Sequence, residues 1–301
     1  MIEQAVFSKV ELKLPSPARS DVTSVLEILD LTNGNRKVVK EFPYVIEAPN
    51  WTPDGRFLIY NSGGKLYRIS PSLPDDEPAL INTGYATNCN NDHQLTRDGR
   101  TLAISHGTKE DRKSRVYTVP VGGGTPRLIT PLAPSYLHGW SPDSKYLAYC
   151  AERNGNFDVY VIPAEGGEEV RLTTAEGLDD GPEYSPDGHI WFNSVRSGLM
   201  QIWRMKADGT EQTQMTFDED RNSWFPHISP DGKQVIYITY NKGDLRPDQH
   251  LANKNVELRL MPAEGGEPIT VAKLFGGQGT INVNSWAPDN KRIAFVSYKV
   301  K

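Results

Sequence analysis

The stretches Trp140-Ser141-Pro142-Asp143-Ser144 and Tyr184-Ser185-Pro186-Asp187-Gly188 are two copies of a phrase that occurs six times in this 301-residue chain. The other four copies occupy residues 51–55, 95–99, 228–232 and 286–290. Their aspartates lie at positions 54, 98, 143, 187, 231 and 289, so every step but the last is close to 44 and the last is longer. A period of about 44 residues that runs through a chain indicates a repeat architecture in which each unit is one supersecondary element.

Each copy of the phrase begins a unit that has the pattern of four short strands. A run of β-branched and aromatic residues follows the turn, as in Val235-Ile236-Tyr237-Ile238. A second hairpin comes next, with a strand such as Val159-Tyr160-Val161-Ile162, a glycine-rich turn at residues 164–167 and a short strand that ends at Leu172-Thr173. No helical periodicity interrupts the pattern. Six four-stranded antiparallel units predict an all-β fold, the six-bladed β-propeller.

The chain ends predict how the ring closes. The sixth Asp, Asp289, lies so close to the last residue, Lys301, that the remaining sequence leaves room for only two strands. Residues 25–29 and 37–39 have the pattern of the missing outer hairpin, so we expect this N-terminal hairpin to complete the last blade beside residues 280–298. We expect residues 1–301 to form a single propeller domain. Residues 5–14 alternate like one more strand, and the segment 1–20 has no predicted place in the ring.

The composition excludes several classes of function. The net charge is -5 and the isoelectric point about 5.7, with no cluster of basic residues that would bind nucleic acid. No apolar run approaches the roughly 18 residues that a membrane span requires. The two cysteines, Cys89 and Cys150, are too few for a disulfide framework and are expected to be buried apolar residues. The sequence as written has no signal peptide and predicts a cytoplasmic monomer, or a periplasmic protein if a signal was removed.

The repeats resemble those of the TolB-type propeller, the WD40-like PD40 family. Its unit is a Trp-Ser-Pro-Asp-Gly turn, an apolar strand, a Ser-x-Arg-x-Gly loop, a strand with a tyrosine, a glycine turn and Leu-Thr. Residues 140–174 and 184–216 match it best, and the resemblance covers about residues 24–298. It implies the propeller without the N-terminal α/β domain of TolB. Related propellers serve an envelope complex, gate prolyl-oligopeptidase-type enzymes, and occur in the tricorn protease and in oligogalacturonate lyases, so the resemblance specifies fold more closely than function.

The loops that lead into the innermost strands should surround the mouth of the central channel, where propellers most often bind ligands. They are rich in polar and aromatic residues, with Tyr136 and Trp224 as candidate stacking surfaces. The polar residues would either line a ligand pocket or be the ordinary polar surface of exposed loops. The candidate ligand-binding residues are Asn91, Asp92, His93, Tyr136, His138, Asp179, Asp180, Glu183, Asn222, Trp224, His227, Asn282 and Asn284.

Three of these histidines occupy similar positions in their repeats. His93 and His138 lie five residues before the repeat Asp, and His227 lies four before it. Neutral imidazoles around a ring can hold a divalent metal, as in the oligogalacturonate lyases that the chain resembles, or they can line the channel as structural residues. No cofactor is expected, with a metal as the alternative. The other histidines, His106, His189 and His250, are expected to be ordinary loop or strand residues.

Catalytic signatures are scarce. There is no Gly-x-Ser-x-Gly phrase, and the repeat aspartates are expected to be structural because they occur once per blade on the opposite face. Asp179, Asp180 and Glu183 form either an acidic site for a cation or for acid–base chemistry, or a solvated loop. The segment 241–255 lengthens the fifth unit on the mouth side, as a binding element or a chance insertion. The sequence favours a non-enzymatic module that binds a protein or peptide; the alternative is a carbohydrate-active lyase or hydrolase that binds a small carbohydrate.

Overall fold

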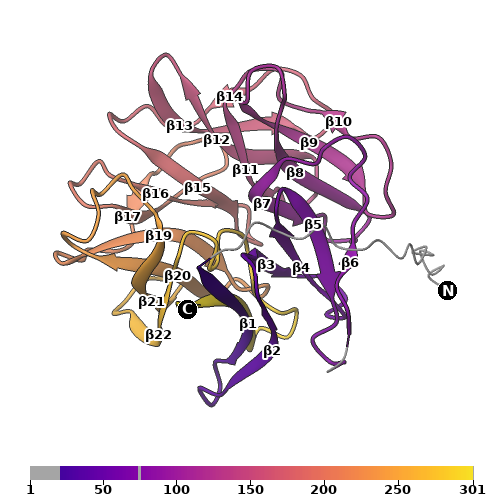
Figure 1. Cartoon of the computed structure of the whole chain (residues 1–301). Coiled ribbons are helices and arrows are strands. Elements are labelled where there is room, and N and C mark those ends of the chain that lie inside the picture. The colour runs from indigo at the N-terminus through magenta and orange to yellow at the C-terminus, as the bar shows by residue number, and fades with distance from the viewer. Residues whose placement is uncertain (1–20, 74–75, 301) are drawn as a thin grey trace.

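The computed structural model describes residues 21–73 and 76–300, and these residues form strands and turns without a helix. Six blades stand around a central channel, and Figure 1 looks down on that ring. None of the described residues forms a helix that is long and apolar enough to cross a membrane. The predicted all-β, six-bladed propeller is therefore confirmed. Residues 5–14, for which the sequence predicts an additional strand, lie outside the described residues.

Five of the blades are four-stranded antiparallel sheets in which the strands follow chain order from the channel outward. The first comprises β3 (Glu47–Trp51), β4 (Leu58–Ser62), β5 (Lys65–Ile69) and β6 (Ala79–Leu80). The second comprises β7 (Cys89–Leu95), β8 (Thr101–Gly107), β9 (Ser114–Pro120) and β10 (Arg127–Leu128). The third comprises β11 (Ser135–Trp140), β12 (Tyr146–Arg153), β13 (Asn156–Pro163) and β14 (Val170–Arg171). The fourth comprises β15 (Asp179–Tyr184), β16 (Ile190–Ser194), β17 (Gln201–Met205) and β18 (Thr213–Gln214). The fifth comprises β19 (Arg221–Ile228), β20 (Gln234–Asn241), β21 (Ala252–Pro262) and β22 (Ile269–Gly277).

The sixth blade joins the two ends of the described chain, as predicted. The strand β1 (Val22–Asp30) pairs with β23 (Arg292–Val300) and with β2 (Arg36–Phe42), and Figure 1 shows this indigo hairpin beside the C-terminus. The innermost position of this blade departs from the prediction of a regular strand. Residues 280–287 make only scattered bonds to β23, such as the Ala294 N–H to the Ser285 carbonyl at 2.9 Å. The closing sheet thus has three regular strands and an irregular inner segment.

The repeated turns owe their sequence to local hydrogen bonds. In the fifth blade the Ser229 hydroxyl donates to Asp231 Oδ1 at 2.7 Å, and the same oxygen accepts the Lys233 N–H at 3.1 Å. The Gly232 N–H closes the turn on the Ser229 carbonyl with a positive φ of 74°. Ser144 and Asn290 adopt the same left-handed conformation at φ values of 59° and 60°. These bonds give the repeat aspartates the structural role that the sequence predicts.

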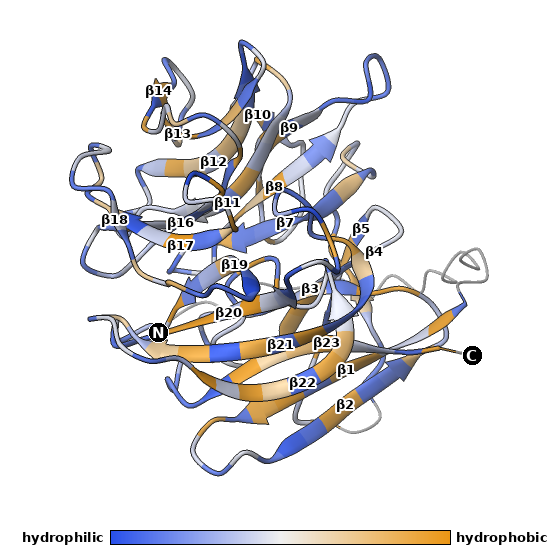
Figure 2. Cartoon of the chain, turned by 90° about the vertical axis from the view of Figure 1, so that its left-hand side faces the viewer, coloured by the Kyte–Doolittle hydropathy of each residue, from blue (hydrophilic) through white to orange (hydrophobic). Residues whose placement is uncertain are grey.

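The core lies between neighbouring blades. One cluster joins Trp191 and Ile202 of the fourth blade to Val235 and Tyr237 of the fifth, and all four side chains are almost completely buried. Figure 2 shows this layering, with hydrophobic strand segments between hydrophilic loops. The two cysteines are unpaired and buried, as expected. Because every blade packs against two others, the mouth loops rest on a rigid support.

Candidate ligand site at the channel mouth

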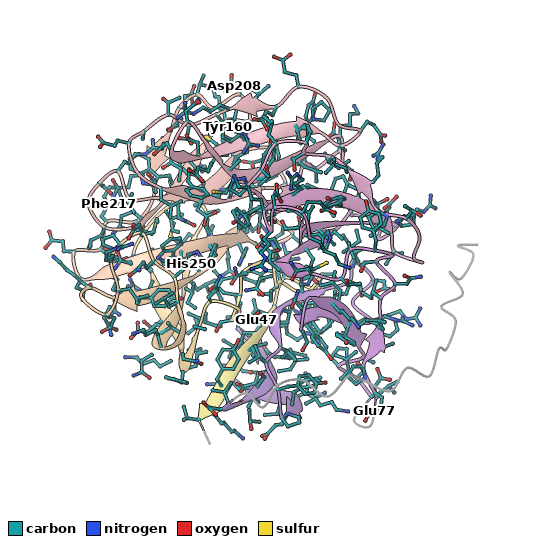
Figure 3. The ribbon with its side chains drawn as sticks, turned by 45° about the horizontal axis from the view of Figure 1, so that its top comes forward. Glu47, Glu77, Tyr160, Asp208, Phe217 and His250 are labelled. Carbon is teal, nitrogen blue, oxygen red and sulfur yellow. The ribbon has the colours of Figure 1, made fainter. Side chains whose placement is uncertain are left out.

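A cavity of about 720 Å³ opens at the mouth of the channel, with walls from all six blades. The inner segment of each blade contributes one residue at an equivalent position to the cavity lining. In five blades this residue lies seven positions before the repeat Asp, and in the fifth blade it lies six positions before. These side chains form a ring of Glu47, Asn91, Tyr136, Asp180, Phe225 and Asn282. Figure 3 shows Glu47 and His250 near the middle of the molecule, whereas Glu77, Asp208 and Phe217 lie at its periphery.

Irregularities in the inner strands aim this ring into the cavity. The pairing register shifts between Glu47 and Asn50, between Asp180 and Glu183, and between Trp224 and His227. At each shift the residue six positions before the repeat Asp has a positive φ, namely Ala48 at 54°, Gly181 at 63° and Phe225 at 54°. Such bulges interrupt the alternation of a strand and redirect its side chains.

Side chains of the second strands hold the inner strand of the next blade in place. Asn61 donates to the carbonyls of Cys89 and Asn90 at 2.9 and 2.6 Å, so the first blade fixes the inner strand of the second. Cys150 donates its thiol to the Asp179 carbonyl at 3.3 Å, and Asn193 accepts the Phe225 N–H at 3.1 Å. The mouth is therefore pre-formed by bonds from one blade to the next.

A second ring lies at the position four residues before the repeat Asp and connects neighbouring blades. Asn50 donates to the His93 carbonyl at 3.1 Å, and Gln94 accepts the Trp140 N–H at 3.0 Å. Glu183 accepts the Ile228 N–H at 3.0 Å and lies 2.7 Å from His227 Nδ1. Asn50, Gln94 and Glu183 therefore link the blades and lie outside the cavity lining.

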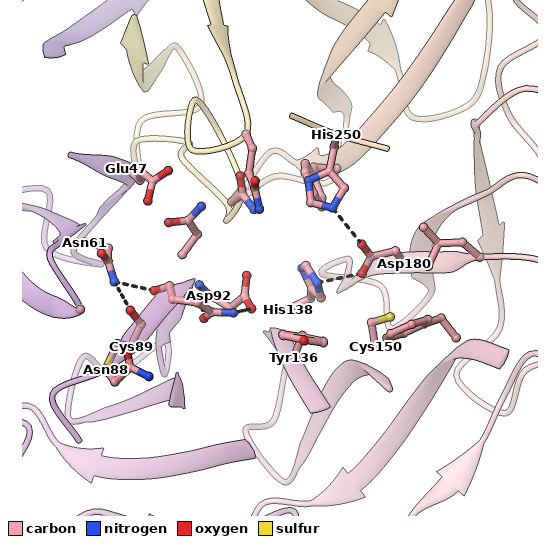
Figure 4. A pocket seen from close by; sticks show the side chains of 18 of the residues that line it. Glu47, Asn61, Asn88, Cys89, Asp92, Tyr136, His138, Cys150, Asp180 and His250 are labelled. Atoms are coloured by element: carbon pink, nitrogen blue, oxygen red, sulfur yellow. Dashed lines mark hydrogen bonds and ion pairs between the residues drawn. The ribbon is translucent and has the colours of Figure 1, made fainter. Parts of the chain in front are cut away.

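A chain of ionisable groups crosses the cavity wall between the third and fifth blades (Figure 4). His138 Nε2 lies 3.1 Å from Asp180 Oδ1, and His250 Nε2 lies 3.9 Å from Asp180 Oδ2. Burial opposes the charged forms of His138 and Asp180, but their mutual bond outweighs it, raising the pKa of His138 and lowering that of Asp180. Burial lowers the pKa of His250, which Asp180 only partly offsets.

His250 corrects the expectation that it is an ordinary loop residue. It belongs to the loop between β20 and β21, which lies on the mouth side as predicted. The centroid of its ring lies 4.5 Å from that of Trp224 and 5.1 Å from that of Phe225. Asp248 of the same loop also lines the cavity. The insertion in the fifth unit thus contributes directly to the site.

The structure divides the sequence-predicted site residues into two groups. Those that line the cavity are Asn91, Asp92, Tyr136, His138, Asp180 and Asn282. Those that lie outside its lining are His93, Asp179, Glu183, Asn222, Trp224, His227 and Asn284. Several of the second group have structural partners, such as Arg196 at 2.6 Å from Asp179. Lining residues absent from the predicted set include Glu47, Asn61, Asn88, Asn90, His250 and Gln278; counting back seven positions from Asp54 would have identified Glu47.

The three candidate metal ligands are not brought together. His138 bonds Asp180, His227 bonds Glu183 and the Ile281 carbonyl, and His93 is fully buried, where burial lowers its pKa to about 4. Within residues 21–73 and 76–300, no three His, Cys, Asp or Glu side chains are grouped to hold a metal ion. The predicted histidine set therefore does not form a common ligand sphere.

Two other carboxyl groups of the cavity differ from Asp180. Burial raises the pKa of Glu47 to about 7, with the charge of Asp92 adding to the effect and Asn91 opposing it. Burial likewise raises the pKa of Asp92 to about 6, although His138 opposes the shift. Among the described residues, the lining contains four carboxylic residues and six amides but neither lysine nor arginine. The cavity therefore presents hydrogen-bonding groups and excess negative charge.

Comparisons with known proteins identify the family. The sequence profile of the TolB beta propeller domain matches residues 131–267. The uncharacterized protein Atu1656 of Agrobacterium fabrum is 44% identical over 97% of this chain and 98% of its own length. A solved structure of a candidate TolB from Agrobacterium tumefaciens superposes with a TM-score of 0.88 at 45% identity, covering 92% of this chain and 99% of that one. The chain belongs to the TolB-type β-propeller family.

More distant similarities extend this result at the level of the fold. The Tol-Pal system protein TolB of Francisella tularensis is 23% identical over 88% of this chain, which spans 60% of that protein's length. An oligogalacturonate lyase in complex with manganese superposes with a TM-score of 0.51 at 13% identity, covering 83% of this chain and 67% of the lyase. At this identity the superposition with the lyase shows a shared fold alone.

Proposed function

We propose that the chain is a non-enzymatic binding module that holds a segment of a protein or peptide at the mouth of its channel. The observation that carries the proposal is the pre-formed cavity of about 720 Å³, a size typical of sites for small ligands or short peptide segments. Its six amide side chains offer both donors and acceptors, which is what a peptide backbone requires. Tyr136, Phe157 and Phe225 add aromatic surfaces for apolar side chains.

The family relationship supports a partner that is a protein. The more distant relatives are named as TolB of the Tol-Pal system, and their likeness to this chain is confined to a propeller-sized part of their length. An envelope role would favour the periplasmic alternative over the cytoplasm. The predicted monomer agrees with a module in which one ring supplies the complete cavity.

Peptide selection tests this proposal. A displayed library of random peptides is selected on the purified protein, and binding of the enriched peptides is measured by calorimetry. We expect Tyr136→Ala to weaken binding about tenfold, because it removes a half-buried aromatic surface of the cavity. The matched control is Phe217→Ala, since Phe217 is an exposed aromatic residue at the periphery of the ring. Failure to enrich any peptide, or equal binding by both variants, would contradict the proposal.

A carbohydrate-active enzyme is the second candidate, and one observation favours it. Asp92 and Asp180 line the same cavity with pKa values shifted in opposite directions, the arrangement of an acid and a base. The test is incubation with neutral and uronic-acid oligosaccharides, with detection of new reducing ends and of unsaturated products. Turnover that Asp92→Asn abolishes would support the enzyme, and its absence across the panel supports the binding module.

A further inference from the structure

We propose that the part of the mouth between the first two blades binds a positively charged nitrogen of the ligand, held between the carboxylates of Glu47 and Asp92. The ligand class is a peptide that presents a lysine, an arginine or a free N-terminus. This inference rests on the proposed function, because it assigns the recognition chemistry of the same cavity.

The two carboxylates face one cavity from neighbouring blades. Glu47 begins β3, Asp92 lies in β7, and Figure 4 shows both side chains directed into the open space. The side chain of Glu47 is packed against Gly279, where an added Cβ would lie only 2.8 Å from Glu47 Oε1. Asp92 is 4% exposed and accepts a 2.6 Å bond from Asn90 Nδ2. Both groups are therefore held in position before any ligand arrives.

Within the described part of the chain, neither carboxylate forms an ion pair with a basic side chain. Three buried acids elsewhere in the ring do: Asp158 lies 2.6 Å from Arg171, Asp179 lies 2.6 Å from Arg196, and Glu27 lies 2.6 Å from Arg36. His138 is close enough to influence Asp92, but its Nε2 is already bonded to Asp180. Glu47 and Asp92 are therefore the two acids of the described cavity lining that lack an ion-pair partner.

A buried acid without a counter-charge is costly, and the cost is removed when a cation binds beside it. The raised pKa values of Glu47 and Asp92 express this cost in the free protein. An ammonium or guanidinium group carries several N–H donors, which suit the carboxylate acceptors of this part of the cavity. An anionic group would meet four carboxylic residues and, among the described lining residues, no lysine or arginine. The charge of the cavity thus selects the sign of the ligand.

The experiment uses small cations as probes of the site alone. Two-dimensional NMR spectra of the isotope-labelled protein are recorded during titration with n-butylammonium, n-butylguanidinium, glycinamide and neutral n-butanol at matched ionic strength. We expect the cations to shift the amide signals of Glu47 and Asp92, and n-butanol to leave them unchanged. The cation that binds with the highest affinity identifies the source of the charge: n-butylammonium stands for a lysine, n-butylguanidinium for an arginine and glycinamide for an N-terminus.

Two isosteric variants locate the cation. We expect Glu47→Gln and Asp92→Asn each to weaken cation binding about tenfold, because each removes a charge-assisted bond. The matched control is Glu77→Gln, since Glu77 is an exposed carboxylate at the periphery of the ring and lies outside the cavity lining. Cation affinity should also rise between about pH 5 and 8, as the two carboxylates ionise. Equal binding by all three variants, or equal binding of n-butanol, would overturn the inference.

The outcomes separate this inference from the proposed function. If the selected peptides bind at the mouth but lack basic groups, and the cations shift no amide signals, the cation site is overturned and peptide binding stands. Cations that bind through Glu47 and Asp92, together with a library that yields no peptide, would uphold the site and overturn the peptide as its ligand. Peptides enriched in basic groups that lose affinity in Glu47→Gln would support both.

Discussion

At the scale of single residues, Glu47 is expected to destabilise the free protein. Its folded pKa of about 7 lies above the ordinary value of 4.5, so the folded state favours the protonated carboxyl group. That favourable contribution is fully present below pH 4.5 and is lost as the pH rises through 7, where the buried group must carry a charge. Glu47→Gln should therefore raise the free energy of unfolding by about 2 kcal/mol at pH 8 and change it little at pH 4. Urea denaturation at both pH values measures this, and a variant less stable at pH 8 would show that the carboxylate has a structural partner.

The same scale shows where sequence reasoning was limited. Counting back four or five positions from the repeat Asp selected His93, His138 and His227, of which His138 lines the cavity and the other two lie outside its lining. The bulges explain this, because a shift by one residue moves a side chain to the other face of a strand. A bulge depends on contacts with the next blade, as with Phe225 and Asn193, so repeat spacing alone does not reveal it. His250 was missed because it belongs to an insertion without a counterpart in other repeats.

At the scale of elements, the repeated turns predict opposite effects for two similar substitutions. Ser144 and Asn290 both occupy the left-handed position of glycine. Ser144→Gly should stabilise the protein by roughly 0.5 kcal/mol, since relief of the backbone strain exceeds the entropy that glycine adds to the unfolded chain. Asn290→Gly should destabilise it by about 1 kcal/mol, because asparagine tolerates this conformation and Asn290 Oδ1 accepts the Asp231 N–H at 2.8 Å. Thermal unfolding of both variants gives the comparison, and equal signs would refute it.

The strands and turns of the blades were the features that the sequence predicted best. The turn phrase and the strand patterns predicted the blades because these features depend on bonds within one repeat, such as that from Ser229 to Asp231. The closing hairpin was predicted from the missing strands of the last unit, and the structure shows it as β1 and β2, with β1 paired to β23. The irregular inner segment at residues 280–287 was not predicted, since its bonds connect it to β23 and to neighbouring blades.

At the scale of the whole molecule, a propeller is stable only if each blade adheres to the next around the full ring. Polar side chains make many of these junctions at the channel, where the blades converge. Glu183 connects three blades, because it bonds His227 and the Ile228 N–H of the fifth blade and accepts from Asn284 Nδ2, in the inner segment of the sixth, at 2.6 Å. Its carboxylate is buried, so none of these partners could bond water in its place without a rearrangement of the channel wall.

Removal of Glu183 should therefore weaken the ring as a whole. We expect Glu183→Ala to lower the free energy of unfolding by about 3–5 kcal/mol, since it leaves His227 and Asn284 buried without their shared acceptor. The control Glu211→Ala removes an exposed ion pair with Lys206 and should change it by less than about 0.5 kcal/mol. Guanidinium denaturation followed by fluorescence and by circular dichroism measures both variants. A single coincident transition at lower denaturant in Glu183→Ala would mean that the junctions act cooperatively around the ring, whereas a separate early transition would show that the fourth to sixth blades can open while the first three persist.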